Sequence, residues 1–178
     1  MAVVAVVAVV AIVALLVVAS LKPNTFSVER SIRVNAPAER VFVEVNDFHR
    51  WATWSPWENL DANLQRTYSG ADAGVGAVYE WQGNSKAGQG RMEIKQTTVP
   101  SSIQIQLDFL KPFEAHNTVE FSLQAQGDAT EVTWKMYGPA NFMSKLMGTV
   151  MSMDKLVGKD FEKGLNALKQ VAEAASQG

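Results

Sequence analysis

Cysteine is absent from the 178 residues, and this absence removes several kinds of site at once. Without thiols the chain has no disulfide framework, no thiolate nucleophile and no thiolate metal ligand. Histidine is scarce as well, since only His49 and His116 occur. Two distant histidines and scattered carboxylates lack the close spacing of a zinc site. We therefore expect neither a metal nor a cofactor.

An excess of charge of one sign is also missing. The chain carries 16 basic and 18 acidic side chains, and no segment clusters Lys and Arg as nucleic-acid-binding proteins do. It contains no serine elbow, phosphate loop or dinucleotide fingerprint. The glycine-rich residues 83–90 lie between two predicted strands and open no helix. The sequence thus argues against nucleic acid and nucleotides as partners.

Charge is missing altogether from the start of the chain. Residues 2–21 contain no ionisable side chain, and their only polar side chain is that of Ser20. Twenty helical residues reach about 30 Å, the thickness of the hydrocarbon core of a bilayer. We therefore interpret residues 1–21 as a single-pass transmembrane anchor. The alternative is a cleaved signal peptide, although the basic n-region is missing and the apolar run is longer than usual.

The residues after this segment bear on orientation and on where the domain begins. Lys22, Arg30 and Arg33 all follow it, which favours a cytoplasmic domain by the positive-inside rule. Long domains are translocated regardless of charge, however, so the sequence leaves the side of the membrane open. Residues 22–25 form a polar linker in which Pro23 stops a helix. We expect one globular domain over residues 26–176, a usual domain length.

Alternation of apolar and polar residues predicts seven strands in this domain. It is clearest in residues 102–110, where Ile103, Ile105 and Leu107 share one face. The other strands are predicted over residues 26–34, 64–69, 76–82, 90–98, 114–125 and 130–137. The last six of the seven follow one another without an intervening helix, which predicts an antiparallel meander.

Two segments have a helical period instead. Val41, Phe42 and Val45 share one face of a short predicted helix over residues 38–45. From Asn141, which can cap a helix, apolar residues recur at steps of three and four to about residue 174. This pattern predicts a long amphipathic helix. Three glycines weaken it by about 1 kcal/mol each, and they allow the helix to bend or to approach the sheet closely.

This order of elements resembles the helix-grip fold of the SRPBCC superfamily, which includes START lipid-transfer domains and the birch pollen allergen. Within it, the residues look like the polyketide cyclase/dehydrase family over about residues 26–172. The similar segments are VERSIRVNAP (28–37), ERVF (39–42), WATWSPW (51–57), GVGAVYEW (74–81) and GKDFEKGL (158–165). The resemblance implies an α+β fold: a curved antiparallel sheet wrapped on a long C-terminal helix, here preceded by one N-terminal transmembrane helix.

The resemblance also implies an apolar ligand cavity, because a curved sheet around one helix does not always fill the space it encloses. The alternative is a solid core, which alternation alone would give equally. The candidate lining residues are those expected to face inward from the strands and the long helix. They are Tyr79, Trp81, Met92, Ile94, Ile105, Leu107, Phe121, Trp134, Met136, Val150, Val157 and Phe161.

Three of the five tryptophans gather within seven residues. Trp51, Trp54 and Trp57 are spaced three apart, so their rings fall on one side of a helical turn. They could form a lid over the cavity or an interfacial membrane anchor. They could instead form a satellite cluster that holds an irregular loop to the sheet. We favour the cluster, because the large buried area of tryptophan suits that task.

Catalytic candidates are few, and His49 is the only one that lies near the tryptophans. As a general base, with Glu58 or Tyr79 as partner, His49 could promote the aldol-type cyclisation known in the family. A solvated surface histidine is the simpler interpretation and the one we favour. His116 alternates with Val119 and Phe121, so it should face solvent.

We therefore expect a domain, tethered through residues 2–21, that binds a hydrophobic small molecule or lipid. A tether restricts a domain to membrane-derived ligands, which favours binding over biosynthesis. The alternatives are a polyketide cyclase or dehydratase and a co-chaperone-like interaction module.

Overall fold

A computed structural model describes residues 2–140, 145 and 153–174, except for the side chains of residues 2, 3, 5, 6, 8, 9 and 11. The described helices are α1 (Ala2–Leu21), α2 (Ala38–Asn46), the short 3-10 helix η1 (Phe48–Thr53) and α4 (Met153–Ala174). The strands are β1 (Thr25–Val34), β2 (Gln65–Gly70), β3 (Ala77–Gln82), β4 (Gln89–Thr98), β5 (Ser102–Lys111), β6 (Ala115–Gln126) and β7 (Ala129–Pro139).

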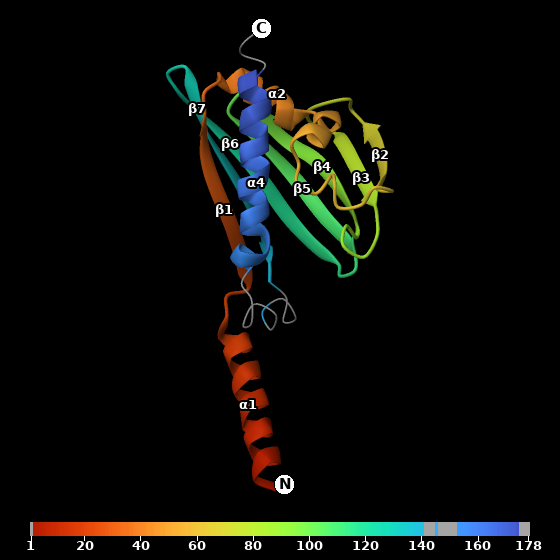
Figure 1. The fold of residues 1–178 in the computed structure, drawn as a ribbon, viewed down its shortest axis with the longest axis vertical. Coiled ribbons are helices and arrows are strands. Elements are labelled where there is room, and N and C mark those ends of the chain that lie inside the picture. The colour runs from red at the N-terminus through yellow and green to blue at the C-terminus, as the bar shows by residue number, and fades with distance from the viewer. Residues whose placement is uncertain (1, 141–144, 146–152, 175–178) are drawn as a thin grey trace.

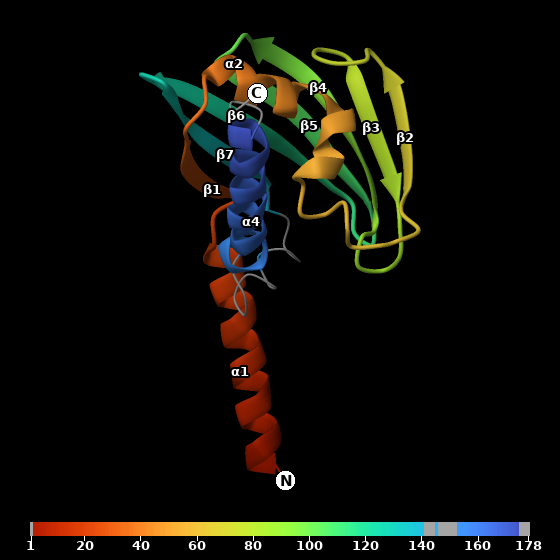
Figure 2. The same cartoon turned by 45° about the horizontal axis from the view of Figure 1, so that its top comes forward.

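The seven strands form one antiparallel sheet in the order β1-β7-β6-β5-β4-β3-β2. Strands β2 to β7 are the predicted meander, and β1 pairs with β7 along its whole length. The sheet curves around α4, while α2 and η1 cover part of its concave face (Figures 1 and 2). The α+β helix-grip architecture is therefore confirmed.

Helix α4 packs closely on the concave face of the sheet. Its residues Phe161, Leu165 and Leu168 are buried, and the Phe161 ring stacks on Trp134 of β7 with 4.4 Å between the ring centroids. A Cβ atom placed on Gly164 would lie 2.7 Å from Cζ3 of Trp134. A glycine is therefore needed where the helix crosses this ring.

An ion-pair cluster also joins α4 to the edge strand β1. Arg30 Nη1 donates to Asp154 Oδ1 at 2.7 Å, and Arg30 Nε donates to Glu162 Oε1 at 2.8 Å. These hydrogen bonds, from Asp154 first and Glu162 second, raise the pKa of Arg30. Gly158 lies directly beneath the guanidinium group and leaves room for it. Arg30 shares a face of β1 with Val28 and Ile32, and these bonds to α4 account for a charged residue on that otherwise apolar face.

The strand register divides the loops between two ends of the sheet. Thr25 lies opposite Pro139, so the chain from α1 enters the domain where β7 ends. The turns at residues 83–88 and 112–114 lie at this end, which we call the α1 end. The turns at 71–76, 99–101 and 127–128 lie at the opposite, distal end.

The long C-terminal helix was predicted from Asn141, and its described part is α4. The predicted cap Asn141 and the lining candidate Val150 lie outside the described residues. Residues 2–21 are helical. Among the described residues, no helix is both long and apolar enough to pass through a membrane. The transmembrane anchor therefore stays a prediction.

Candidate functional site

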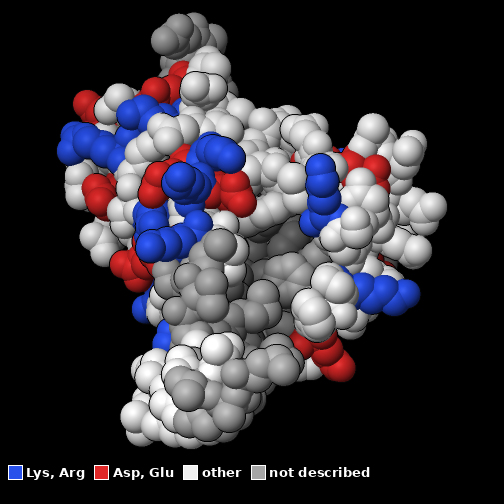
Figure 3. Space-filling view, turned by 60° about the horizontal axis from the view of Figure 1, so that its bottom comes forward, with Lys and Arg blue, Asp and Glu red and all other residues white. Residues whose placement is uncertain are grey.

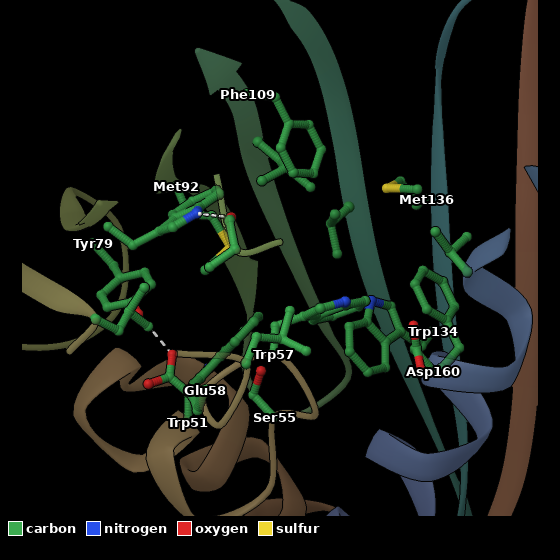
Figure 4. Close-up of a pocket in the computed structure, with 18 of the residues that line it drawn as sticks. Trp51, Ser55, Trp57, Glu58, Tyr79, Met92, Phe109, Trp134, Met136 and Asp160 are labelled. Carbon is green, nitrogen blue, oxygen red and sulfur yellow. Dashed lines mark hydrogen bonds between the residues drawn. The ribbon is translucent and has the colours of Figure 1, made fainter. Parts of the chain in front are cut away.

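A cavity of about 350 Å³ lies between the concave face of the sheet, the loop of residues 54–64 and the start of α4 (Figure 4). Most of its wall is aromatic or aliphatic: Trp51, Trp57, Leu60, Leu64, Tyr79, Trp81, Ala87, Met92, Leu107, Phe109, Val119, Trp134, Met136, Val157 and Phe161. The remaining wall residues are Ser55, Glu58, Lys86 and Asp160. A cavity of this size and composition suits a small apolar molecule.

Eight of the twelve candidate lining residues are in this wall: Tyr79, Trp81, Met92, Leu107, Trp134, Met136, Val157 and Phe161. Ile94, Ile105 and Phe121 are not in the wall, and all three are fully buried in the core. Helix α2 packs against β5 and β6 and covers part of the concave face of the sheet. Alternation identifies the inner face of a strand but not where along that face another element covers it.

The tryptophan cluster divides into two parts. The Nε1 atoms of Trp51 and Trp54 donate to the carbonyl oxygens of Val45 and Glu44, at 3.0 and 3.1 Å. Both rings are buried, so they fix the loop to α2, and Trp54 takes no part in the cavity wall. Trp57 is only partly buried, and its ring meets the Trp134 ring edge to face at 5.4 Å.

Two of the wall residues, Trp134 and Phe161, belong to a stack of three rings. Trp134 lies between Phe121, at 4.9 Å, and Phe161, at 4.4 Å between ring centroids. The indole Nε1 of Trp134 is buried and has no hydrogen-bond partner among the described residues. A buried donor without a partner is unfavourable by about 1–3 kcal/mol. Trp134 of β7 therefore brings a polar atom without a protein partner to the cavity wall.

One corner of the wall is polar. Glu58 is 6% exposed, and its Oε1 accepts a hydrogen bond from the Tyr79 hydroxyl at 2.6 Å (Figure 4). Its Oε2 accepts from Arg66 Nε, also at 2.6 Å, and its backbone carbonyl accepts from Arg66 Nη2 at 2.9 Å. Burial, and then the bond to Glu58, raises the pKa of Tyr79, so its phenol is protonated at neutral pH. The corner thus presents compensated polar groups rather than a net charge.

This corner was only partly visible in the sequence. Glu58 and Tyr79 were named there as partners for a catalytic histidine, whereas Arg66 was missed. Arg66 has the same parity as Leu64 and Tyr68 and lies opposite Trp81 of β3. Alternation therefore places it on the inner face of the strand, but gives no partner for a charged side chain there. Its bond to Glu58 depends on how the preceding loop folds back.

His49 lies outside the cavity wall. Its side chain is exposed, its Nδ1 is 2.9 Å from Asp47 Oδ1, and its ring stacks on Tyr68 at 4.2 Å. His116 is exposed as well, as its place in the alternation indicated. Among the described residues, no three side chains of the metal-binding types are grouped to hold an ion.

Solved structures with the same fold have low sequence identity to this chain. Protein CV1439 from Chromobacterium violaceum is 16% identical with a TM-score of 0.57, over 85% of this chain and 99% of that one. Protein Ms6760 from Mycobacterium smegmatis is also 16% identical, with a TM-score of 0.57 over 84% and 92% of the two chains. These similarities show the fold alone.

The di-domain ARO/CYC protein BexL, from the BE-7585A biosynthetic pathway, is 16% identical with a TM-score of 0.59. The similarity covers 88% of this chain and 52% of BexL. None of the curated proteins matches the sequence. The family described as "Polyketide cyclase / dehydrase and lipid transport" matches residues 25–173. This match covers most of the chain, including every strand and nearly all of α4, and the protein therefore belongs to the polyketide cyclase / dehydrase and lipid transport family.

Proposed function

We propose that the domain binds a hydrophobic small molecule or lipid in its cavity, at a membrane to which residues 2–21 attach it. The cavity carries this proposal, because about 350 Å³ of space is walled mainly by aromatic and aliphatic side chains. Burying apolar ligand surface there is favourable by about 25 cal/mol per Å². The polar corner at Glu58 and Tyr79 suits a ligand with a hydroxyl or carbonyl group at one end.

The exposed apolar surface of α1 supports the membrane attachment. Its described side chains include nine Val, Ile and Leu residues between Val4 and Val18 that are exposed, and Leu21 follows them. The Ser20 hydroxyl donates back to the Val17 carbonyl oxygen at 2.7 Å, so this polar group is satisfied within the helix. Such a surface is unfavourable in water and favourable in lipid.

The attachment is tested by fractionation of the full-length protein. We expect it to sediment with membranes and to resist carbonate extraction. A mature protein that is soluble and begins near Ser20 would show a cleaved signal peptide instead.

The competing function is a cyclase or dehydratase that acts on a polyketide-like substrate. The hydrogen-bonded pair of Glu58 and Tyr79 favours it, because both side chains face the cavity and could exchange a proton with a ligand. Two observations favour binding instead. Arg66 already holds the carboxylate as an ion pair, and His49 lies outside the wall.

Ligand binding is tested with N-phenyl-1-naphthylamine, an uncharged fluorescent probe. We expect saturable binding to one site in the full chain. The double change Val157→Trp with Met136→Phe fills the cavity with added rings, so the binding should disappear while the circular dichroism spectrum is retained. As a matched control, Val75→Trp adds a ring on the exposed distal turn and should leave binding unchanged. Absence of binding to the wild type, or undiminished binding to the double variant, would contradict the proposal.

A further inference from the structure

The cavity lies towards one end of the sheet. Among the wall residues that the structure describes, the two exposed ones are Leu60, in the loop before β2, and Lys86, in the turn after β3. Strand β2 begins at the α1 end, and the turn of residues 83–88 lies at that end too. The opening of the cavity is therefore at the α1 end. Figure 3 faces this end and shows the surface hollowed beside it, with a basic side chain at the border of the hollow.

Helix α1 leaves the domain at the same end. The strand register requires this, because Thr25 pairs with Pro139 where β7 ends. Both ribbon views show α1 projecting away from the sheet on the side where the β3–β4 and β5–β6 turns lie (Figures 1 and 2). A bilayer that holds α1 would thus lie below the cavity opening.

The charges of the described turns differ between the two ends. At the α1 end the turn after β3 carries Lys86 and the last residue of β5 is Lys111, and neither has an ion-pair partner among the described residues. Two acidic residues at this end have partners: Glu114 is 3.3 Å from His116 Nε2, and Asp61 Oδ2 accepts a hydrogen bond from the backbone N–H of Asn84 at 2.7 Å. The distal turns contain the acidic residues Asp72 and Asp128 and no basic residue. The α1 end is therefore the better match for anionic lipid headgroups.

Exposed apolar residues occur at both ends of the sheet, so by themselves they do not indicate which end faces the membrane. Phe113 is 69% exposed at the tip of the β5–β6 turn, with Leu110 exposed beside it. At the distal end Val99 is 72% exposed in the β4–β5 turn. Among the described residues, the exposed aromatic ring is that of Phe113, at the α1 end, in the turn that follows Lys111. That combination is typical of protein surfaces that sit at the membrane interface.

We propose that the α1 end rests on an anionic bilayer surface, with the β5–β6 turn around Phe113 as a second membrane contact beside α1. The cavity then opens onto the bilayer, and an apolar ligand passes between lipid and cavity without crossing water. This inference rests on the proposed membrane attachment, and it adds an orientation of the domain and a second contact surface.

The absence of cysteine allows a direct test in the full chain. Phe113→Cys and Val99→Cys each create a single thiol in an exposed turn, one at either end of β5. Each variant is labelled with a nitrobenzoxadiazole fluorophore and reconstituted into phosphatidylcholine vesicles containing phosphatidylserine. We expect the emission at position 113 to shift to the blue and to be quenched by nitroxide-labelled lipid. The label at position 99 should keep the emission of a water-exposed fluorophore and should not be quenched by the nitroxide-labelled lipid.

Charge reversal tests the contribution of the lysines. In the Phe113→Cys background, Lys86→Glu and Lys111→Glu should each reduce the docked population about fivefold or more in phosphatidylserine vesicles. In vesicles of phosphatidylcholine alone, the two changes should have little effect. If Phe113→Cys perturbs the turn, Leu110→Cys provides a second label site at the same end.

The outcomes separate this inference from the functions proposed above. Flotation with the vesicles reports the attachment by α1, and N-phenyl-1-naphthylamine titration reports the cavity. Flotation together with a label at position 113 that stays in water, or with equal signals at 113 and 99, overturns the second contact and leaves the attachment standing. Failure to float overturns the attachment and this inference with it, whatever the probe shows.

Discussion

The hydroxyl group of Tyr79 and the carboxylate of Glu58 lie 2.6 Å apart and join β3 to the loop that forms one wall of the cavity. Arg66 holds the other carboxylate oxygen at the same distance. The loop that carries Trp57 is therefore tied to the sheet by polar bonds as well as by aromatic packing. This arrangement positions the wall of the cavity before any ligand arrives.

Replacing the carboxylate should weaken this link. Glu58→Gln removes the ion pair with Arg66 and leaves a neutral acceptor for Tyr79. We expect the free energy of unfolding to fall by about 1–3 kcal/mol, measured by urea denaturation. Glu80→Gln, on the exposed face of β3, is the matched control and should stay within about 0.5 kcal/mol of the wild type. Equal values for the two variants would contradict the structural role of Glu58.

Two glycines of α4 should respond differently to the same change. Gly164→Ala pushes a methyl group against the buried Trp134 ring and to within 3.0 Å of Pro56 Cδ. We expect it to destabilise the fold by about 1–3 kcal/mol, despite the better helix propensity of alanine.

Gly158→Ala serves as the control in the same helix. Its methyl group meets only the flexible end of Arg30. The stability lost through the weakened surface ion pairs of Arg30 and the gain of about 1 kcal/mol from the helix propensity of alanine should nearly cancel. Thermal unfolding of both variants gives the comparison, and an equal loss of stability would contradict the close approach of α4 to Trp134.

The two histidines provide a pH test. The hydrogen bond to Asp108, supported by Glu114, raises the pKa of His116 above its usual value near 6.5. With only two histidines in the chain, NMR can follow both imidazole rings. We expect His116 to titrate above pH 6.5 and Asp108→Asn to lower its pKa.

The sign of the accompanying stability change follows from linkage. A raised folded-state pKa stabilises the fold below about pH 6.5, where His116 is charged in both states, and this contribution disappears as the pH rises through the folded-state pKa. The stability difference between wild type and His116→Gln should therefore be present in mild acid and absent in alkali. A difference that grows with pH would contradict the ion pair.

Much of the fold could be predicted from the sequence, because strands with one buried face alternate with period two. All seven strands were predicted to within a few residues of their observed bounds. The wall of the cavity was predicted less well. Ile94 and Phe121 alternate just as Met92 and Val119 do. What separates core from wall is what covers the sheet: α2 packs on β5 and β6, and the rings of Trp51 and Trp54 pack on Phe121. Val119 was therefore missed for the same reason.

The loop that completes the cavity was the hardest part to predict. Trp54 and Trp57 each follow the preceding tryptophan by three residues, so the sequence does not tell them apart. In the structure the Trp54 ring is bonded to a carbonyl oxygen of α2, whereas Trp57 lines the cavity. The ion pairs of Arg30 with α4 depend on contacts between segments far apart in the sequence, and the bond between Arg66 and Glu58 depends on how the loop between them folds back. Local periodicity carries no signal for such contacts.

The central claim, an apolar molecule held in the cavity, is tested most directly by native mass spectrometry of the full chain purified in detergent. We expect the wild type to carry one copy of a bound apolar molecule after the detergent has been stripped in the gas phase. The double variant Val157→Trp with Met136→Phe should retain its fold and appear as the bare chain. A bare wild-type chain that also fails to take up N-phenyl-1-naphthylamine, or the same adduct on both proteins, would contradict the account.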